Sequence, residues 1–146
     1  MSTNLVSLRR ATPADQPLLM GLAAEFYAVD GHPYDAQRVL GALKPLLEDD
    51  RYGAVYIVSP DRGYAVITWG YSLESGGREA LVDELFLRER GTGLGTVVLS
   101  QLLDRVRQRG IGTVFLETEK ANAAARRFYQ RAGFTEDDSI WLSLKL

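Results

Sequence analysis

The spacing of apolar residues in the first third of the chain predicts a strand followed by two helices. Residues 5–9 alternate in the manner of a short strand. Thr12 and Asp15, on either side of a proline, are typical of a helix start with Thr12 as the N-cap, and helical spacing continues to about residue 28. A second helix is expected to begin at Asp35, and Pro45 is expected to kink or interrupt it.

The remainder of the chain is predicted to consist mainly of strands, with two further helices. Helical spacing of apolar residues begins at Leu94 and stops at Gly110. Asn122 and Gly133 mark the start and the end of another helix. The predicted strands are residues 54–58, 64–69, 79–87 and 114–117, followed by 134 and 140–144, which would finish the sheet.

The order of these elements favours one fold class. In chain order they are β-α-α-β-β-β-α-β-α-β-β, with antiparallel strands first and a βαβ unit later. The sheet is therefore expected to be mixed, in an α/β or α+β arrangement. No repeat, charge block or Ser/Pro-rich linker interrupts the pattern, so residues 1–146 are predicted to form a single domain.

The composition is that of one ordinary globular domain, and it narrows the chemistry. The 146 residues are 46% hydrophobic and 25% charged, with no cysteine. This excludes a disulfide, a thiolate nucleophile and Cys-ligated zinc, and an intracellular, cytoplasmic location is expected. The net charge of −2 argues against a nucleic-acid partner. No apolar run suits a signal peptide or a transmembrane helix, so no membrane association is expected.

A glycine-rich segment between a predicted strand and a predicted helix is the first candidate for chemistry. Gly91, Gly93 and Gly95 alternate with Thr92 and Leu94. Glycines let backbone amides approach an anion closely, and the helix N-terminus adds positive potential. The same glycines would equally serve a tight strand-to-helix turn that needs positive φ angles.

Two familiar phosphate-binding loops fit this segment poorly. A Walker loop needs Gly-Lys-Ser/Thr, which the segment lacks. A dinucleotide loop needs Gly-x-Gly-x-x-Gly/Ala, but its last position is Thr96 counted from Gly91 and Val98 counted from Gly93. Glu117 does follow about 20 residues on, as that motif requires, yet only one βαβ unit fits in the remaining chain. A nicotinamide-dependent enzyme is therefore a distant alternative.

Asn122 and Tyr129 form the second candidate. They are seven residues apart, which places them two turns along one helix face. Ala125, Phe128 and Ala132 form a neighbouring apolar stripe that would pack into the core. Without a ligand, the same pattern makes Asn122 an N-cap and Tyr129 a half-buried aromatic residue.

Together the two segments resemble the GCN5-related N-acetyltransferase (GNAT) family. Arg90-x-x-Gly93-x-Gly95 is similar to the acetyl-CoA pyrophosphate loop of that family, Arg/Gln-x-x-Gly-x-Gly/Ala. Residues 122–134 resemble its last block, Asn-x-x-Ala-x-x-(aromatic or Leu)-Tyr-x-x-x-Gly-Phe. The resemblance covers about residues 80–145. It implies the acyl-CoA N-acyltransferase fold, with a mixed, mostly antiparallel central sheet flanked by about four helices.

The reaction that the resemblance implies is acetyl transfer from the co-substrate acetyl-CoA directly to an amine, without a metal. Tyr129 stands where the family has its general acid. Glu117 is the first candidate for the general base, because a glutamate at the matching place serves as base in the related ribosomal-protein N-terminal acetyltransferases. Glu84, on the preceding strand, is the second candidate, and Glu119 is expected to lie outside the site.

The resemblance also implies two sets of binding residues. For acetyl-CoA these are Leu85, Phe86 and Leu87 on the strand, Arg90, Gly91, Thr92, Gly93, Leu94, Gly95 and Thr96 in the loop, and Asn122 and Arg126 on the helix. For the acceptor they are Phe26, Tyr27, Asp30, His32 and Tyr34, between the first two helices.

Aromatic rings interleaved with carboxylates in the acceptor segment suit a cationic amine. A capped turn between helices with a buried Phe26 would give the same pattern, and His32 has no partner at metal-ligand spacing. A small amine and a protein lysine or N-terminus remain equally open as acceptors. The frequent dimers of the family make a homodimer a candidate assembly.

A second function remains open beside the enzyme, namely a non-catalytic acyl-CoA-binding regulatory module. The presence of both Glu117 and Tyr129 favours the enzyme. The nicotinamide enzyme stays a distant third.

Overall fold

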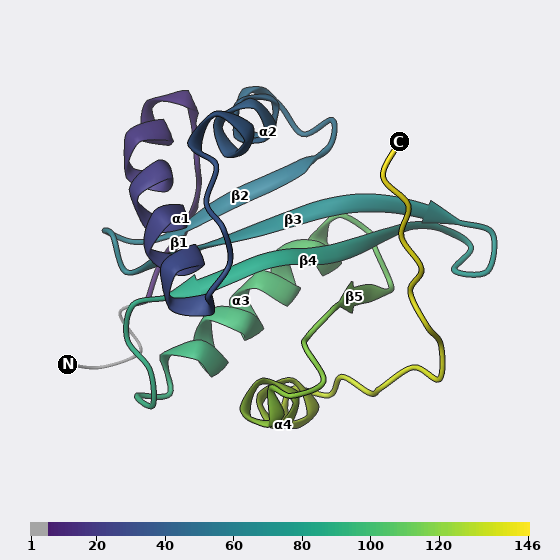
Figure 1. The fold of residues 1–146 in the computed structure, drawn as a ribbon. Coiled ribbons are helices and arrows are strands. Elements are labelled where there is room, and N and C mark those ends of the chain that lie inside the picture. Colours follow the sequence, from purple (N-terminus) through teal and green to yellow (C-terminus); the bar gives the residue numbers. More distant parts are fainter. Residues whose placement is uncertain (1–5) are drawn as a thin grey trace.

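Figure 1 shows the computed structural model of the chain, which describes residues 6–146. Its centre is a five-stranded sheet in the order β1-β2-β3-β4-β5. The first four strands pair antiparallel and β5 pairs parallel to β4, so the predicted mixed, mostly antiparallel sheet is confirmed. Position 5 of the first predicted strand lies outside the described residues. The strands are β1 (Leu8–Arg10), β2 (Gly53–Val58), β3 (Gly63–Ser72), β4 (Gly77–Leu87) and β5 (Val114–Leu116).

Helices cover both faces of this sheet. α1 and α2 lie on one face and α3 on the other, while α4 lies beside β5 (Figure 1). A short 3-10 turn, η2 (Pro13–Asp15), leads into α1. The helices are α1 (Gln16–Asp30), α2 (Ala36–Glu48), α3 (Leu94–Gln108) and α4 (Ala123–Arg131).

The strand β2 is buried along its whole length, because successive residues face two different cores. Ala54, Tyr56 and Val58 pack with the apolar face of α3. Val55 and Ile57 pack with α1 and α2. The sheet therefore stands between two apolar layers, and the site described below lies at its β4–β5 end.

Two carboxylates begin the first helices as predicted. Asp35 accepts a hydrogen bond from the backbone amide of Arg38 at 3.2 Å, which caps α2. Asp15 accepts one from the backbone amide of Thr12 at 2.8 Å. Arg9 also pairs with Asp15 at 2.7 Å, and the hydrogen bonds to Arg9 hold the pKa of Asp15 at about 2.

The predicted interruption of the second helix at Pro45 is wrong. α2 continues through Pro45 to Glu48. A proline inside a helix removes one backbone hydrogen bond. Leu43 and Leu47, on either side of it, are both buried against α1 and the sheet, and this apolar burial holds the helix together across the proline.

A one-residue bulge divides β4 into two halves. Glu84 pairs with Val66, but the next residue of β3, Ile67, pairs with Val82, so Asp83 is the extra residue. Val66 faces α1 and α2, whereas Ile67 faces α3. In a regular strand Glu84 and Val82 would share a face. The bulge instead turns Glu84 toward α1.

The predicted strand at residues 140–144 is wrong. No residue after Arg131 is part of a helix or strand, and residues 135–146 make no backbone hydrogen bond within the described part of the chain. Alternation of apolar and polar residues is a local property. A strand, however, exists only where a neighbouring strand supplies hydrogen bonds, and this segment has none beside it.

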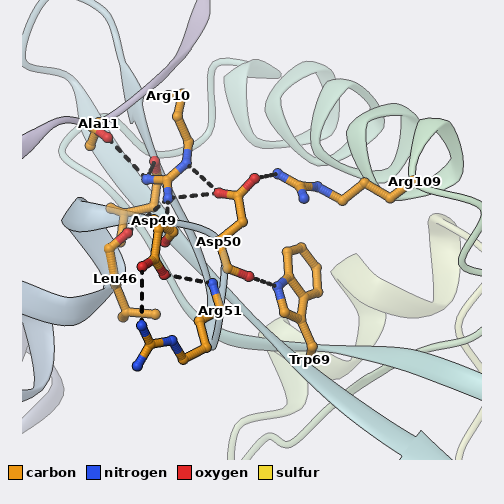
Figure 2. A network of polar contacts seen from close by, with 9 residues as sticks. Arg10, Ala11, Leu46, Asp49, Asp50, Arg51, Trp69 and Arg109 are labelled. Atoms are coloured by element: carbon orange, nitrogen blue, oxygen red, sulfur yellow. Dashed lines mark hydrogen bonds and ion pairs between the residues drawn. The ribbon is translucent and has the colours of Figure 1, made fainter.

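At the end of the sheet opposite the glycine loop, Asp50 joins several elements (Figure 2). Its carboxylate accepts hydrogen bonds from Arg10 at 2.9 Å and from Arg109 at 3.1 Å. Its backbone carbonyl accepts one from the Trp69 indole at 2.8 Å. The Arg109 guanidinium also lies 4.7 Å from the centre of the Trp69 ring. These contacts connect β1, β3 and the end of α3.

No helix among residues 6–146 is long and apolar enough to cross a bilayer.

Candidate active site

A cavity of about 510 Å³, called here the loop cavity, lies between the end of β4, the glycine loop and α4. β5 pairs with β4 only from Ala80 to Val82, so the backbone of β4 beyond the bulge has an open edge on the side of β5. That open edge supplies amide and carbonyl groups to the cavity. Ten of the predicted site residues line it, namely Leu85, Phe86, Leu87, Arg90, Gly91, Gly93, Gly95, Thr96, Asn122 and Tyr129.

The backbone of the glycine loop adopts the conformation that only glycine takes easily. Gly91 has φ 73° and Gly93 has φ 81°, and Gly93 is the N-cap of α3. Amides in the first turn of a helix have no acceptor within the helix. Those of Gly95 and Thr96 are in this turn, and both residues line the loop cavity. The loop is thus a tight turn that also presents amides to the cavity.

Gly95 is required for a different reason, which is close packing. A Cβ atom at this position would lie 3.2 Å from the ring of Phe128 on α4. The lack of a side chain lets α3 and α4 approach each other on the wall of the cavity. A side chain at this position would therefore press on Phe128 in the cavity wall.

Ion pairs fix the start of the loop. Arg88 pairs with Glu25 on α1 at 2.5 Å and with Asp61, in the β2–β3 turn, at 3.2 Å. Arg62 pairs with Glu89 at 3.2 Å. Arg90 forms no ion pair with any residue in the range 6–146, so its charge is available at the rim of the loop cavity.

Three residues predicted to bind acetyl-CoA do not line the loop cavity. The side chain of Leu94 is buried in the α3 core, and Thr92 is exposed and does not line the loop cavity. The hydroxyl of Thr92 accepts a 3.4 Å hydrogen bond from the Leu94 amide. Arg126 lines the neighbouring groove described below.

Asn122 and Tyr129 both line the loop cavity. Asn122 caps α4, since its side-chain oxygen accepts a hydrogen bond from the Ala125 amide at 3.0 Å. The ring of Tyr129 lies between Phe128 and Phe134, with ring centres 5.0 and 5.7 Å away. Burial raises the pKa of Tyr129, because the phenolate is the form that loses hydration. The phenol is therefore protonated at neutral pH.

Tyr129 also lines a second depression of about 620 Å³, called here the β5 groove. Glu117, which follows β5, lines the same groove. Arg126 lines it too, and its Nε atom is buried without a hydrogen-bond partner among residues 6–146. A phenol and a carboxylate thus line one groove from two elements.

Glu84 lines neither depression and is held by two phenols. Tyr27 on α1 donates to one carboxylate oxygen at 2.5 Å, and Tyr64 on β3 donates to the other at 2.7 Å. Burial, reinforced by the adjacent Glu84 carboxylate, raises the pKa of both tyrosines well above the ordinary value. Both phenols therefore remain donors, and each occupies one oxygen of the Glu84 side chain.

The predicted acceptor residues divide into an aromatic part and an exposed polar part. Phe26 is stacked on Phe86 at 5.3 Å, so it packs in the core. Tyr27 and Tyr34 meet edge to face at 5.7 Å, and the Tyr34 hydroxyl donates to the Met20 carbonyl at 3.2 Å.

The polar part includes Glu119, which the sequence had been expected to place outside the site. His32 Nε2 lies 3.0 Å from an Asp30 carboxylate oxygen and 3.3 Å from one of Glu119. Glu119 follows β5, whereas Asp30 ends α1. The predicted acceptor segment is therefore linked directly to the chain just beyond Glu117.

Several residues of the loop cavity were missed by sequence reasoning. These are Glu89, Ala124, Ala125, Phe128 and Arg131. Ala124, Phe128 and Arg131 are spaced by four and three residues, which puts them on one face of α4. That spacing could have identified Arg131 as a second positive charge on this wall.

Among the described residues there is no group of three or more His, Cys, Asp or Glu side chains that could hold a metal ion.

Comparison with known proteins shows which family the chain matches. Residues 58–134 match the family described as "Acetyltransferase (GNAT) family". The chain is 27% identical over 139 residues to the mycothiol acetyltransferase of Thermobispora bispora, a match that covers 89% of this chain and 46% of that protein. It is 43% identical over 44 residues to the [ribosomal protein bS18]-alanine N-acetyltransferase of Escherichia coli K12, which is 30% of each chain.

The matches thus span less than half the length of these two curated relatives. A solved structure, an integron cassette protein from the mobile metagenome of Cole Harbour Salt Marsh, is similar over nearly the whole chain. It has a TM-score of 0.83 and 31% sequence identity, and the match covers 95% of this chain and 90% of that one.

Proposed function

The chain belongs to the GNAT acetyltransferase family, and on this premise we propose that it is an acyltransferase that transfers the acetyl group of acetyl-CoA directly to an amine. The whole of the chain would act as one catalytic domain. Because the sequence has no cysteine, no thiol of the protein is available to carry the acetyl group in between.

The loop cavity is the proposed binding site for acetyl-CoA. The amides of Gly95 and Thr96, with the charges of Arg90 and Arg131, suit the pyrophosphate. The open edge of β4 at residues 85–87 suits the amides of the pantetheine arm. A backbone amide of that edge would stabilise the negative charge that develops on the thioester oxygen.

The chemistry requires two proton transfers. An alkylamine with a pKa of about 10.4 is largely protonated near pH 7, so a base must remove one proton before attack. The amine nitrogen then forms a bond to the carbonyl carbon, and the bond from that carbon to sulfur breaks. The departing thiolate takes a proton from a general acid.

Tyr129 is the proposed general acid. It lines both the loop cavity and the β5 groove, and this position between the two depressions is the observation that carries the proposal. Its raised pKa keeps the phenol protonated, and a phenol can protonate a thiolate whose conjugate acid has a pKa of about 8.5.

Glu117 is the proposed general base. It is exposed and shares the β5 groove with Tyr129. Glu84, the alternative, has each of its oxygens occupied by a phenol. Glu84 also lines neither the loop cavity nor the β5 groove, so we propose that it positions Tyr27 and is not the base.

The proposed acceptor is a cationic amine. The carboxylates of Asp30 and Glu119 both contact His32, which lies between the end of α1 and the segment that follows β5. An ammonium group could replace the imidazole between the two carboxylates. A small amine and a protein lysine or N-terminus both satisfy this chemistry. The name of one relative, the [ribosomal protein bS18]-alanine N-acetyltransferase, indicates a protein acceptor for that enzyme.

Calorimetric titration with acetyl-CoA, followed by thiol release with a panel of amines, tests the proposal. We expect saturable binding of acetyl-CoA and release of free CoA only when an amine is present. Binding without turnover on any small amine or on peptides with free N-termini and lysines would reject the proposed reaction. Absence of binding would reject the proposed cavity as well.

A further inference from the structure

Three successive residues in the second half of α1 each contact a different residue along β4 and its continuation. The pairs are Glu25 with Arg88, Phe26 with Phe86, and Tyr27 with Glu84. Residues 84, 86 and 88 recur at every second position, so they are on the side of the strand that faces α1. Of the three contacts, the pair of Glu25 and Arg88 lies beyond the end of β4, next to the glycine loop.

The guanidinium of Arg88 is fixed by two other elements. Its Nε and Nη2 atoms donate to the two carboxylate oxygens of Glu25, at 3.0 and 2.5 Å. Its Nη1 atom donates to Asp61, in the turn between β2 and β3, at 3.0 Å to the carbonyl and 3.2 Å to the carboxylate. A planar guanidinium that forms a two-bond fork with a carboxylate has a defined orientation. Arg88 therefore joins α1, the β2–β3 turn and the end of β4 in one fixed arrangement.

The chain enters the glycine loop directly from this arrangement. Only Glu89 separates Arg88 from Arg90. Arg62 holds Glu89 through two hydrogen bonds of 3.3 Å, and the carbonyl of Arg62 accepts a 2.9 Å hydrogen bond from the backbone amide of Arg88. Glu89 and Arg90 both line the loop cavity. A displacement of residue 88 would therefore move the start of that wall.

Neither stability nor charge accounts for this ion pair. The side chains of Arg88 and Glu25 are 39% and 45% exposed, and ion pairs in contact with solvent contribute little to the stability of a fold. Glu25 and Asp61 also neutralise the positive charge of Arg88, and neighbouring carboxylates weaken the attraction of a cation for an anionic ligand. The arrangement instead suits a role in holding the backbone.

We infer that Glu25 and Arg88 are positioning residues for the glycine loop, and that their pair sets where the loop begins and so how tightly the loop cavity binds its ligand. The inference rests on the proposed function only for the identity of that ligand, acetyl-CoA. Neither residue lines the loop cavity, so both act through the backbone that follows Arg88. α1 also carries Phe26 and Tyr27 of the predicted acceptor segment, so one helix adjoins both proposed substrates.

Calorimetric titration of Glu25→Gln with acetyl-CoA gives a test in which the direction of the change decides. The amide nitrogen of glutamine is a donor and cannot face the guanidinium, so the fork is lost while the shape of the side chain is kept. Loss of positioning should weaken binding by at least about 5-fold, the lower end of the range for coupling between separate sites. Loss of a negative charge alone would instead tighten the binding of an anionic ligand. Tighter or unchanged binding would overturn the inference.

Two further variants separate positioning from charge and from helix stability. Arg88→Lys keeps the positive charge but loses the planar fork, so it should weaken acetyl-CoA binding as Glu25→Gln does. Asp15→Asn is the matched control, because Asp15 forms a similar two-bond fork with Arg9, at 2.9 and 2.7 Å, next to the start of the same helix. This variant also removes one negative charge, and it should leave the affinity unchanged. Wild-type affinity in Arg88→Lys, or an equal loss of affinity in Asp15→Asn, would contradict positioning by the pair.

Hydrogen exchange of the ligand-free chain separates a failure of this inference from a failure of the proposed function. The backbone amide of Arg88, which donates to the carbonyl of Arg62, should exchange faster in Glu25→Gln than in the wild type or in Asp15→Asn. Unchanged exchange of this amide would overturn the inference whether or not acetyl-CoA binds. A wild-type chain that does not bind acetyl-CoA, together with faster exchange in Glu25→Gln, would reject the proposed function and support the positioning role.

Discussion

The phenol of Tyr27 on α1 donates a 2.5 Å hydrogen bond to the carboxylate of Glu84 on β4. The two residues are 57 positions apart in sequence, and they meet because the bulge at Asp83 turns Glu84 toward α1. The bond therefore connects the predicted acceptor segment to the strand that borders the loop cavity. Removal of this hydrogen bond should lower the free energy of unfolding and leave the affinity for acetyl-CoA nearly unchanged.

Tyr27→Phe should lower the free energy of unfolding by about 1.5–3 kcal/mol, the range for a hydrogen bond to a charged group. Urea denaturation measures the loss. Tyr34→Phe, which removes a hydrogen bond to a neutral carbonyl at 3.2 Å, is the control and should cost about 1 kcal/mol. Equal losses in both variants would contradict a special role for the Glu84 carboxylate.

Tyr129→Phe should lower kcat by about 100-fold and leave acetyl-CoA affinity nearly unchanged, because only the proton donor is lost. Steady-state thiol release and calorimetry measure the two quantities. Tyr71→Phe, at an exposed tyrosine near the β3–β4 turn, should have no effect. An unchanged kcat in Tyr129→Phe would remove Tyr129 from the mechanism.

The pH dependence follows from the raised pKa of Tyr129. A tyrosine is active as an acid only below its pKa, so raising that pKa moves the loss of activity to higher pH. The limb of the kcat profile that belongs to Tyr129 should lie above about pH 10, the ordinary tyrosine value. A Tyr129-dependent limb between pH 7 and about pH 9 would be inconsistent with burial of the phenol.

Glu117→Gln should abolish the acidic limb of the kcat profile, because the amide cannot accept the proton of the ammonium group. The parallel variant Glu84→Gln should keep that limb and instead lose stability, since both phenols lose a charged acceptor. If the acidic limb survives in Glu117→Gln and disappears in Glu84→Gln, Glu84 is the general base and Glu117 is not.

Gly95→Ala should weaken acetyl-CoA binding, because the new methyl group would press on Phe128 in the cavity wall. Gly41→Ala is a matched change inside α2, where a Cβ meets nothing within 4 Å. It should raise stability by about 0.5–1 kcal/mol through helix propensity, without any change in binding. Equal affinity in both variants would show that the packing at Gly95 is not part of the site.

Most of the fold follows from local patterns in the sequence. The caps at Asp35 and Asn122 were predictable because an N-cap bonds to an amide only three residues away. The loop cavity was predictable in outline, since Gly93 and Asn122 each mark the start of a helix whose first turn borders it.

Features that depend on distant contacts could not be predicted in this way. The bulge at Asp83 has no local signal, yet it decides which way Glu84 points. The link from His32 to Glu119 joins residues that only the tertiary fold brings together. Pro45 breaks a local rule because burial of its neighbours outweighs one lost hydrogen bond.

Two regions of the sheet should respond differently to thermal fluctuation. Asp50 holds β1, β3 and the end of α3 together through two arginines and a tryptophan, whereas β5, at the edge of the sheet, and α4 contain no buried residue. Backbone amides of β5 and α4 should therefore exchange with deuterium long before those of β2 and β3. Because the loop cavity spans β4 and α4, a ligand there ties the fast-exchanging part to the slow one. Occupancy would then appear as protection of the amides along α4, which lines the cavity.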